Sequence, residues 1–369
     1  MAPYRTLAAG SLPETEASIV QVDCAMKRLS ASALHFCGLV FRGIRWAIVL
    51  GLFTWSVGAV YSFSLLPRFV TVPLAVAYLA AVGYAFTRIK PPDRWRQLVA
   101  AAVAVIYLIC LTQRPSNNRQ WAPDNAVVPD VIITGNNISV TGFRHSVYRS
   151  ESDTDVHYRD CAFRLTDLQQ VWFVVQRFTT LEGIAHNFLT FFVAGADGPR
   201  YFSVSVEIRR EEGESFDPVK GLYRQYELIY IIADERDEIG SRTVLRPDDR
   251  VFLYPVNATP VQVQQLFLDI VARIQILREH PEFYHSLANN CTNNIVNHAY
   301  KFTPLPISSL DPRILAPGFA DRLAFAKGLI GIPGETFEGL QQRCRIDEIA
   351  REVGITDNFS EHIRRRVDD

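Results

Sequence analysis

The chain divides into an apolar N-terminal third and a longer part in which apolar residues alternate with polar ones or recur at helical spacing. The longest uncharged stretch runs from 46 to 66, and its 21 residues are enough for a helix to cross about 30 Å of hydrocarbon. The pattern predicts a membrane anchor over residues 46–112 with three transmembrane helices, at 46–66, 69–86 and 98–112. The third stretch has only 15 residues, a length that also suits a buried or interfacial helix.

Basic residues in the short loops predict how this anchor is oriented. Four Lys or Arg residues lie between 27 and 45 and four between 88 and 96, whereas only Arg68 separates the first two spans. Because positive charge accumulates in cytoplasmic loops, segment 1–45 is predicted to be cytoplasmic and everything after about residue 113 to lie on the far side of the membrane. If the third stretch does not cross, the C-terminal domain is cytoplasmic instead.

After the anchor the pattern predicts a linker and then a sheet. Residues 113–125 are rich in Pro, Asn and Arg, which is typical of a linker. Residues 130–148 place two β-branched runs around Gly135, which predicts a hairpin. A second hairpin is expected around the turn at 195–198. The strands predicted beyond the first hairpin are 168–178, 185–193, 200–209, 226–232 and 250–255.

From Thr259 onward the pattern becomes helical. Apolar residues recur every three or four positions between 263 and 277, and Thr259 with Gln262 has the spacing of a capping box. A second helix is predicted at 291–300, after Pro281 has ended the first. Further helices are expected near 321–329 and 346–366. A sheet followed by helices predicts an α+β domain over 126–345 with a C-terminal helical tail at 346–369.

Composition narrows the possible functions. With 38 Lys and Arg against 39 Asp and Glu, the chain lacks the basic footprint of a general nucleic-acid binder, so no nucleic-acid partner is expected. The mean hydropathy of +0.05 averages an apolar anchor with a polar domain. Walker A, GxGxxG, CxxC, HExxH and GxSxG patterns are absent from the sequence, so neither a cofactor nor a metal site is predicted. The oligomeric state stays open.

The cysteines supply a candidate nucleophile. Three of the six, Cys161, Cys291 and Cys344, follow the anchor, and an odd number in a disulfide-forming compartment leaves one thiol unpaired. Cys291 follows the polar Asn290 at a predicted helix start, where N–H groups and the helix dipole stabilise a thiolate. We therefore expect Cys161 to pair with Cys344. A lone cysteine is more often a small buried residue that only packs, so a base has to be identified.

His186 is the candidate base. It opens an apolar strand, and the next strand carries Glu207, which can lie across the hairpin and fix the imidazole tautomer. The alternatives are a structural His–Glu pair or a surface pair between Glu207 and Arg209. His298 lies seven residues beyond Cys291, about two helical turns or 10 Å away, which is too far for a direct bond.

The remaining dense polar cluster is the run 234–237 followed by Arg242. Such a run is more often a solvated turn crossed by ion pairs. The functional alternative is a loop that binds substrate or supports the site.

The order of the motifs resembles the Lnb-type N-terminal periplasmic domain family. The segments that carry the resemblance, within residues 115–300, are Pro115–Trp121, Gly183–His186, Ser205–Arg210, Asp234–Asp237, Tyr254–Pro255 and Asn290–Thr292. The family is similar to a circularly permuted branch of the NlpC-type papain-like superfamily, in which the histidine strand precedes the cysteine helix. The resemblance implies a papain-like domain with an antiparallel sheet and packed helices.

The resemblance also assigns roles to residues. It implies Cys291 as nucleophile, His186 as base and Glu207 as the third polar residue, the least secure of the three because that position varies in the superfamily. Candidates for substrate binding or support of the site are Asn290, Arg209, Asp234 and Arg236.

The family includes a lipoprotein N-acyltransferase, which implies an acyl-enzyme on Cys291. The expected function is therefore a cysteine acyltransferase or lipid-acyl hydrolase on the periplasmic side of a bacterial inner membrane, with a membrane lipid or lipoprotein as substrate. The chain has three predicted N-terminal spans and lacks a long C-terminal membrane region, so the acceptor stays open. The alternatives are a cysteine amidase or peptidase acting on cell-wall peptides and a non-catalytic envelope-binding domain.

Overall fold

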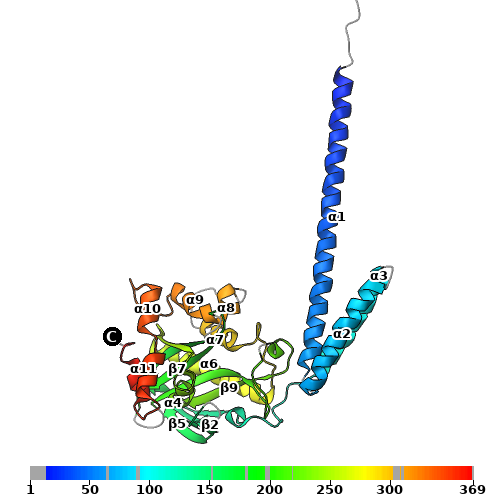
Figure 1. Cartoon of the computed structure of the whole chain (residues 1–369). Helices are drawn as coiled ribbons and strands as arrows, with labels where there is room; N and C mark the ends of the chain where they lie inside the picture. The colour runs from blue at the N-terminus through cyan, green and yellow to red at the C-terminus, as the bar shows by residue number, and fades with distance from the viewer. Residues whose placement is uncertain are drawn as a thin grey trace, which may run out of the picture. The chain divides into compact units, whose positions relative to one another are not determined.

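A computed structural model of the chain shows a mixed α+β protein with three apolar N-terminal helices (Figure 1). The residues that it describes are 14–63, 66–88, 92–150, 153–178, 182–195, 200–217, 219–301, 308 and 311–367. The chain forms two compact units, which are described separately below. The first comprises residues 1–61 and 66–109, and the second comprises 62–65 and 110–369.

The first unit consists of α1 (Glu14–Ser62), α2 (Arg68–Arg88) and α3 (Pro92–Thr112). Within the described part of the chain, three helical segments are long and apolar enough to cross a membrane. These candidate spans are Phe36–Ser62, Arg68–Arg88 and Arg94–Thr112. The third has 19 residues rather than the 15 expected, which brings it into the range that crosses a bilayer.

The first helix begins much earlier than the predicted span. Residues 14–62 contain no proline, so nothing interrupts the helix between Glu14 and the apolar stretch. The first candidate span therefore starts at Phe36, inside the segment 1–45 that was expected to be cytoplasmic. Residues 1–13 of that segment lie outside the described residues.

The second unit is built on one mixed sheet. Eight of the described strands join in the order β1-β2-β9-β8-β7-β6-β10, with β5 paired to β2. The bounds are β1 (Asp130–Thr134), β2 (Asn137–Arg144), β5 (Tyr158–Arg164), β6 (Leu168–Arg177), β7 (Ala185–Val193), β8 (Tyr201–Arg209), β9 (Glu227–Asp234) and β10 (Arg250–Pro255). Neighbouring strands are antiparallel except for β2 and β9, which are parallel. A separate short pair joins β3 (Val147–Tyr148) to β4 (Thr154–Asp155).

Most strands lie where alternation predicted them. Both predicted hairpins are present, since β1 pairs with β2 and β7 with β8. Residues 196–199 of the second turn lie outside the described residues. The strand β5 was not predicted, because charged residues interrupt its apolar alternation in YRDCAFR.

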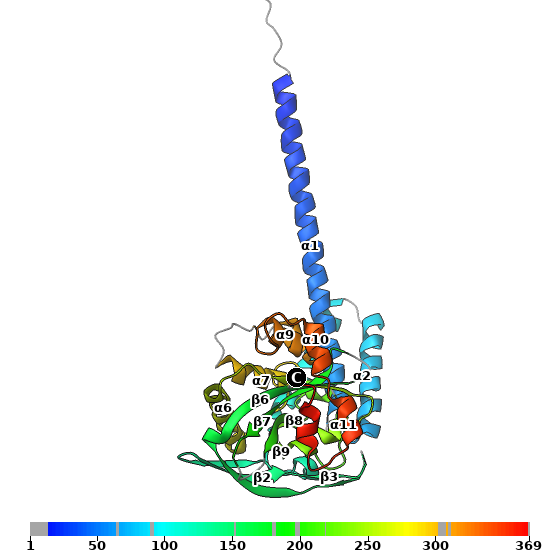
Figure 2. The same cartoon turned by 90° about the vertical axis from the view of Figure 1, so that its left-hand side faces the viewer.

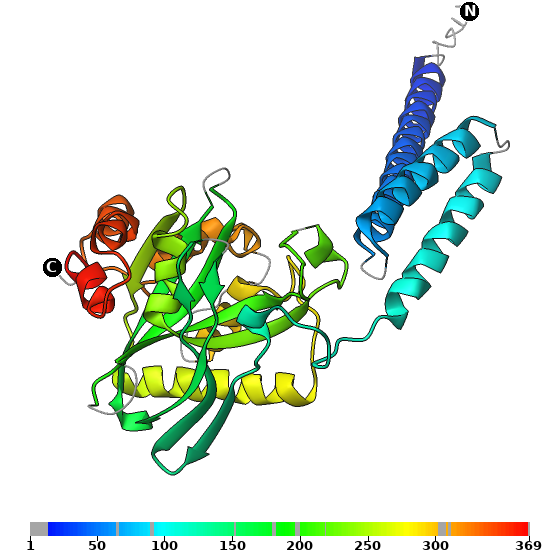
Figure 3. The same cartoon turned by 60° about the horizontal axis from the view of Figure 1, so that its bottom comes forward.

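Helices cover both faces of the sheet (Figures 2 and 3). On one face lie α6 (Pro260–Glu279) and α7 (Cys291–Tyr300), and Phe267 of α6 packs against Phe191 and Phe202. The helices on the other face are α4 (Glu235–Glu238), α5 (Gly240–Thr243), α11 (Asp347–Val353) and α12 (Phe359–Arg364). The remaining short helices are α8 (Pro312–Leu315), α9 (Ala320–Ala326) and α10 (Phe337–Arg343).

Capping residues set where the two long helices of this unit begin. Thr259 and Gln262 form the predicted capping box of α6, and Asn290 forms a second one at the start of α7. The region expected to be helical at 346–366 holds two short helices separated at Gly354, whose φ of +66° favours glycine. Their apolar side chains belong to the same core as the sheet.

The expected disulfide between Cys161 and Cys344 is wrong, because neither cysteine takes part in a disulfide. Cys161 lies on β5, which pairs with β2 toward one end of the sheet. Cys344 follows α10, and its carbonyl oxygen accepts a hydrogen bond from Leu253 on β10, the strand at the other end. The two cysteines are therefore separated by the width of the sheet.

Residues 113–125, expected to be a linker, are bound to the sheet by Arg209. The Arg209 guanidinium donates to the Asn117 side chain at 2.9 Å and to the Asn125 carbonyl oxygen at 3.0 Å. It also lies 4.4 Å from the ring centre of Trp121. This segment is thus an ordered part of the second unit.

A buried ion pair joins the C-terminal helix α12 to α4. The two terminal nitrogens of the Arg364 guanidinium, Nη1 and Nη2, donate to the two carboxylate oxygens of Glu235, Nη1 at 2.7 Å, and both side chains are buried. The guanidinium carbon also lies 4.2 Å from the ring centre of Trp172 and 4.1 Å from that of Tyr201. Thr190 on β7 donates to Glu235 at 2.6 Å. The pair therefore connects the C-terminal end of the chain to the sheet.

Replacement of Arg364 by alanine is expected to lower the free energy of unfolding by about 3–5 kcal/mol, because it leaves the Glu235 carboxylate buried without a counter-charge. Urea unfolding of the detergent-solubilised full chain, followed by tryptophan fluorescence, measures this loss. The control is Arg365→Ala, which removes an exposed guanidinium and should change the free energy by less than about 0.5 kcal/mol. Equal losses in the two variants would contradict the assignment.

Candidate active site

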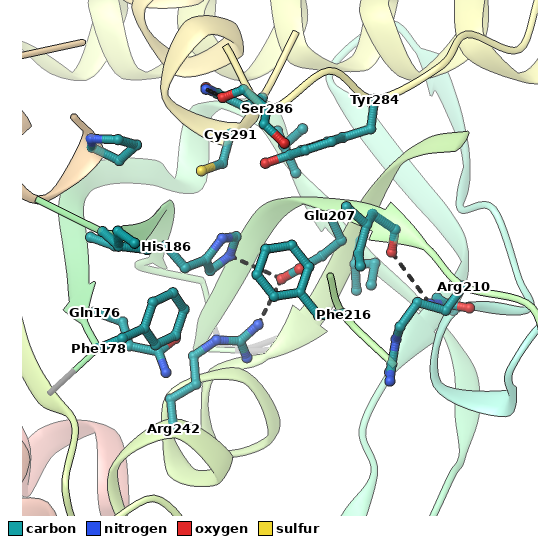
Figure 4. Close-up of a pocket in the computed structure, with 18 of the residues that line it drawn as sticks. Gln176, Phe178, His186, Glu207, Arg210, Phe216, Arg242, Tyr284, Ser286 and Cys291 are labelled. Carbon is teal, nitrogen blue, oxygen red and sulfur yellow. Dashed lines mark hydrogen bonds and ion pairs between the residues drawn. The ribbon is translucent and has the colours of Figure 1, made fainter. Parts of the chain in front are cut away.

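The predicted nucleophile, base and third polar residue line one cavity of the second unit. Its volume is about 1140 Å³, and Cys291, His186 and Glu207 all contribute to its wall. Figure 4 shows the thiol and the imidazole facing the same space, with the carboxylate behind the ring. From the sequence, the proximity of these three residues was predicted only by the expected hairpin and by the family resemblance.

Cys291 is the first residue of α7 and is almost fully buried, with 4% of its surface exposed. Asn290 caps the helix by accepting a hydrogen bond from the Asn293 amide at 2.9 Å. The first-turn amides of a helix have no partner inside the helix, so the dipole and the N–H groups favour a negative sulfur here. The Thr292 hydroxyl, 3.8 Å from Sγ, adds a further contact.

His186 and Glu207 are neighbours across the β7–β8 hairpin. The ladder pairs Phe188 with Ser205, and the same register continued by two residues sets His186 opposite Glu207. His186 Nε2 lies 2.9 Å from Glu207 Oε1 and 2.7 Å from the Ser205 hydroxyl, which itself donates to Glu207 at 2.7 Å. Because Nε2 is engaged by Glu207 and Ser205, Nδ1 is the ring nitrogen left for the thiol.

A chain of buried charges continues behind Glu207. Arg242 of α5 contacts Glu207 at 2.6 Å and Glu238 at 2.9 Å. Glu238 also pairs with Arg144 on β2, whose guanidinium binds Asp237 through both carboxylate oxygens. Arg144, Asp237 and Glu238 are at most 4% exposed. The carboxylate beside His186 is therefore fixed by charges that reach across the unit.

These contacts shift the pKa values of the pair in opposite directions. Burial acts to lower the pKa of His186, but the Glu207 carboxylate and Cys291 outweigh it and raise the pKa to about 10. Burial acts to raise the pKa of the Cys291 thiol, but the interactions with His186, the Asn187 backbone and Thr292 hold it below its usual value. The pKa of Glu207 lies well below its usual value, because His186 and Arg242 outweigh burial. The arrangement favours a thiolate–imidazolium pair at neutral pH.

Tyr284 places a phenol beside this pair. Its ring lines the cavity, and Figure 4 shows its hydroxyl pointing toward Cys291. Burial, with the nearby Cys291 and Glu207, raises the pKa of Tyr284 well above its usual value, so the hydroxyl stays a hydrogen-bond donor. No hydrogen bond of this hydroxyl to another described residue is found. A substrate oxygen at the thiol could accept one.

Apolar side chains form much of the remaining wall. They come from β8, β9, the end of α8 and the segments that connect the strands and helices. These apolar residues include Phe178, Ile184, Val206, Ile208, Phe216, Leu222, Ile231, Leu245, Leu287, Leu315 and Pro317. Such a wall with a few convergent polar groups is typical of a site for a largely apolar ligand.

The other predicted site residues lie in different places. Asn290 lines the cavity, whereas Arg209, Asp234 and Arg236 are not among the described residues of its wall. Asp234 caps α4 and binds Arg236, and Arg236 also pairs with the exposed Asp357. Arg209 holds residues 117–125, as described above.

The charged run after Asp234 is not a solvated turn. Glu235, Asp237 and Glu238 are at most 1% exposed, and Glu238 supports the site through Arg242. The alternative weighed for this run, a loop that supports the site, agrees with these contacts. Charge alone could not predict the burial, which is made possible by Arg144 and Arg364, far away in the sequence.

One group of described residues has the geometry to hold a metal ion. The possible ligand atoms of His186, Glu207 and Glu238 lie within 4.8 Å of one another. The Arg242 guanidinium already contacts both carboxylates, and a metal cation would have to share the space with that charge. The residues therefore fit a guanidinium-bridged network better than a metal centre.

The comparisons with known proteins agree with the motif order. Residues 155–317 match the model of the Lnb N-terminal periplasmic domain family, and this range includes His186, Glu207 and Cys291. The motif at 115–121 lies outside the matched range. No curated protein and no solved structure matches the chain. The match confirms the resemblance to this family over residues 155–317, and together with the apolar N-terminal helices it indicates a membrane-anchored periplasmic protein.

Proposed function

We propose that the protein is a cysteine enzyme that transfers or hydrolyses the acyl group of a membrane lipid or lipoprotein through an acyl-enzyme on Cys291. The observation that carries this proposal is the buried pair of Cys291 and His186, with the thiol pKa lowered and the imidazole pKa raised, in an apolar-walled cavity. A reactive cysteine with a positioned base is the arrangement that nucleophilic catalysis needs. The apolar wall suits an acyl chain.

In the first half of the proposed cycle, the Cys291 thiolate attacks the acyl carbonyl carbon and forms a C–S bond. The carbonyl electron pair moves to oxygen, where the start of α7 and the Tyr284 hydroxyl can donate hydrogen bonds to the oxyanion. Collapse of this intermediate breaks the ester C–O bond, and His186 gives its proton to the leaving alkoxide. The products are an alcohol and a thioester.

In the second half, neutral His186 takes a proton from an amine or a water molecule as that nucleophile attacks the thioester. Collapse regenerates the thiolate and releases an amide or a carboxylic acid. Glu207 keeps the imidazole oriented throughout, and Arg242 keeps Glu207 in place. Both are positioning residues, since neither is assigned a contact with the reacting atoms.

We also propose that the domain has a permuted papain-like fold and lies on the periplasmic side of a bacterial inner membrane. The order of β7 with His186 before α7 with Cys291 supports the permutation. The orientation is supported by the three candidate spans and by the basic residues that cluster before the first span and before the third. On this proposal, residues 46–112 anchor a periplasmic domain over 126–345.

Replacement of Cys291 by alanine is expected to abolish formation of the acyl-enzyme. Intact-mass spectrometry of the full chain, incubated with phospholipid vesicles, should detect one acyl adduct on the wild type and none on the variant. Cys161→Ala is the matched control, because it removes a free thiol outside the cavity wall, and it should keep the adduct.

A wild-type chain that releases amino acids or peptides from muropeptides and forms no adduct with phospholipid would contradict the proposal in favour of an amidase or peptidase. A chain that is inert toward both would favour a binding domain.

The pH dependence of Cys291 alkylation tests whether the thiol ionises below its usual pKa. The rate of reaction with iodoacetamide should rise through an apparent pKa below the usual thiol value, because His186 stays protonated up to a pKa of about 10 and stabilises the sulfur anion. Glu207→Gln removes the charge that raises the His186 pKa, so the midpoint should move to higher pH. Quantification of the Cys291 peptide by mass spectrometry measures the rate.

The control for this experiment is Glu338→Gln, which neutralises an exposed carboxylate and should leave the midpoint unchanged. A midpoint that is the same in wild type and Glu207→Gln would show that Glu207 does not support the pair.

Tyr284→Phe is expected to lower the rate of acyl-enzyme formation by about 10²–10³-fold, the usual loss when one oxyanion donor is removed. The alkylation midpoint of Cys291 should change little, because the phenol is proposed to act on the oxyanion rather than on the thiolate. Single-turnover assays measure the rate, with Tyr300→Phe, an exposed phenol on α7, as control. Equal rates in both variants would exclude Tyr284 from the oxyanion site.

A further inference from the structure

Four large apolar side chains are exposed at the wall of the cavity that holds Cys291. Ile184, Phe216, Leu287 and Leu315, here called the apolar rim, are 41%, 50%, 50% and 41% exposed, and all four line the cavity. Single exposed apolar residues are ordinary, but a contiguous group around a cavity marks an interaction surface.

The rim is assembled from four separate segments. Ile184 precedes β7, Phe216 follows β8, Leu287 precedes α7 and Leu315 ends α8. No single amphipathic helix or strand explains them, so their convergence depends on the fold. Exposure of these four apolar side chains to water is unfavourable. A hydrocarbon surface next to the cavity would remove them from water.

The segment that follows the membrane anchor contacts the part of the second unit that carries one of the rim residues. Residue 113 directly follows α3, and the Gln113 side chain accepts a hydrogen bond from Gln225 at 3.1 Å. Farther along, the Ala122 amide donates to the Arg210 carbonyl oxygen at 2.9 Å. Both partners belong to the stretch between β8 and β9, which also carries Phe216. The segment that follows the last candidate span along the chain is thus hydrogen-bonded to the stretch that contributes Phe216 to the rim.

Basic side chains accompany the apolar ones. Arg210 and Arg246 also line the cavity, and Arg246 is exposed. Arg210 pairs with Asp124, and both side chains keep about a third of their surface exposed. Apolar residues that enter a bilayer interface are commonly flanked by arginines that meet the phosphate groups.

We propose that the apolar rim inserts into the headgroup and upper acyl region of the bilayer that holds the anchor, so that the cavity opens onto lipid. The partner is a lipid surface, and acyl chains reach Cys291 without crossing water. The docking of the rim stands on exposure and connectivity, and only its use in acyl transfer rests on the function proposed above.

Photo-crosslinking of the full chain in proteoliposomes tests this docking. A benzophenone amino acid replaces Leu287 or Phe216, one at a time, in the Cys291→Ala background, and the vesicles contain phosphatidylethanolamine and phosphatidylglycerol. Mass spectrometry of the labelled peptide measures lipid adducts after irradiation. The matched controls carry the same amino acid at Ile276 or Ile332, which are exposed by 49% and 62% and do not line the cavity.

Both rim positions are expected to give at least about tenfold more lipid adduct than the controls, since hydrocarbon is the nearest reactive partner only at an inserted side chain. Adducts at the rim that do not exceed the controls would overturn the proposal, as would adducts between two copies of the chain. Two rim positions keep the test valid if one variant fails to fold. The crosslinking variants carry Cys291→Ala, so their lipid adducts do not depend on an acyl-enzyme. Lipid adducts at the rim would therefore support the docking even if the wild type forms no acyl-enzyme, which separates this inference from the proposed function.

Discussion

The candidate active site depends on the guanidinium of Arg242. Arg242 lies between two carboxylates, those of Glu207 and Glu238, and Glu238 is also held by Arg144. Buried carboxylates are costly unless they are paired, so the loss of Arg242 would leave two of them short of positive charge. The same contacts fix the oxygen that faces His186. The stability of this region and the basicity of the imidazole therefore have a common origin.

This constraint links segments that are far apart in the chain. Arg144 comes from β2, Glu238 and Arg242 from the turn after β9, and Glu207 and His186 from the β7–β8 hairpin. Cys291 approaches from α7, which packs on the opposite face of the sheet and begins beside the start of β7, where Asn187 donates a hydrogen bond to Thr292 at 2.9 Å. The capping box of Asn290 fixes the first turn of that helix, and with it the position of the sulfur. The site thus lies where the two helical layers meet, beside the start of β7 and the end of β8.

Local patterns predicted the elements well and the long-range contacts poorly. Alternation located β7 and β10 to the residue, and the polar residues before Cys291 located the start of α7. The burial of Glu235 and Glu238 was missed, because a charged run has the same composition whether it is solvated or paired with distant arginines. The expected bond between Cys161 and Cys344 failed for a similar reason, since spacing in the sequence does not give distance across a sheet.

The Glu207 carboxylate beside His186 also affects which acceptor of the acyl group is favoured in the proposed cycle. Once the thiolate has become a neutral thioester, the imidazole has lost one negative neighbour but keeps Glu207 at 2.9 Å. The Glu207 carboxylate still acts to raise the pKa of the imidazole, which favours its acceptance of a proton. An α-amino group has a pKa of about 7.7–8.0, and it attacks only after losing a proton. An imidazole whose pKa is raised by a fixed carboxylate suits that acceptor better than an unperturbed imidazole would. An apolar cavity filled by an acyl chain also leaves little room for water to compete with the amine.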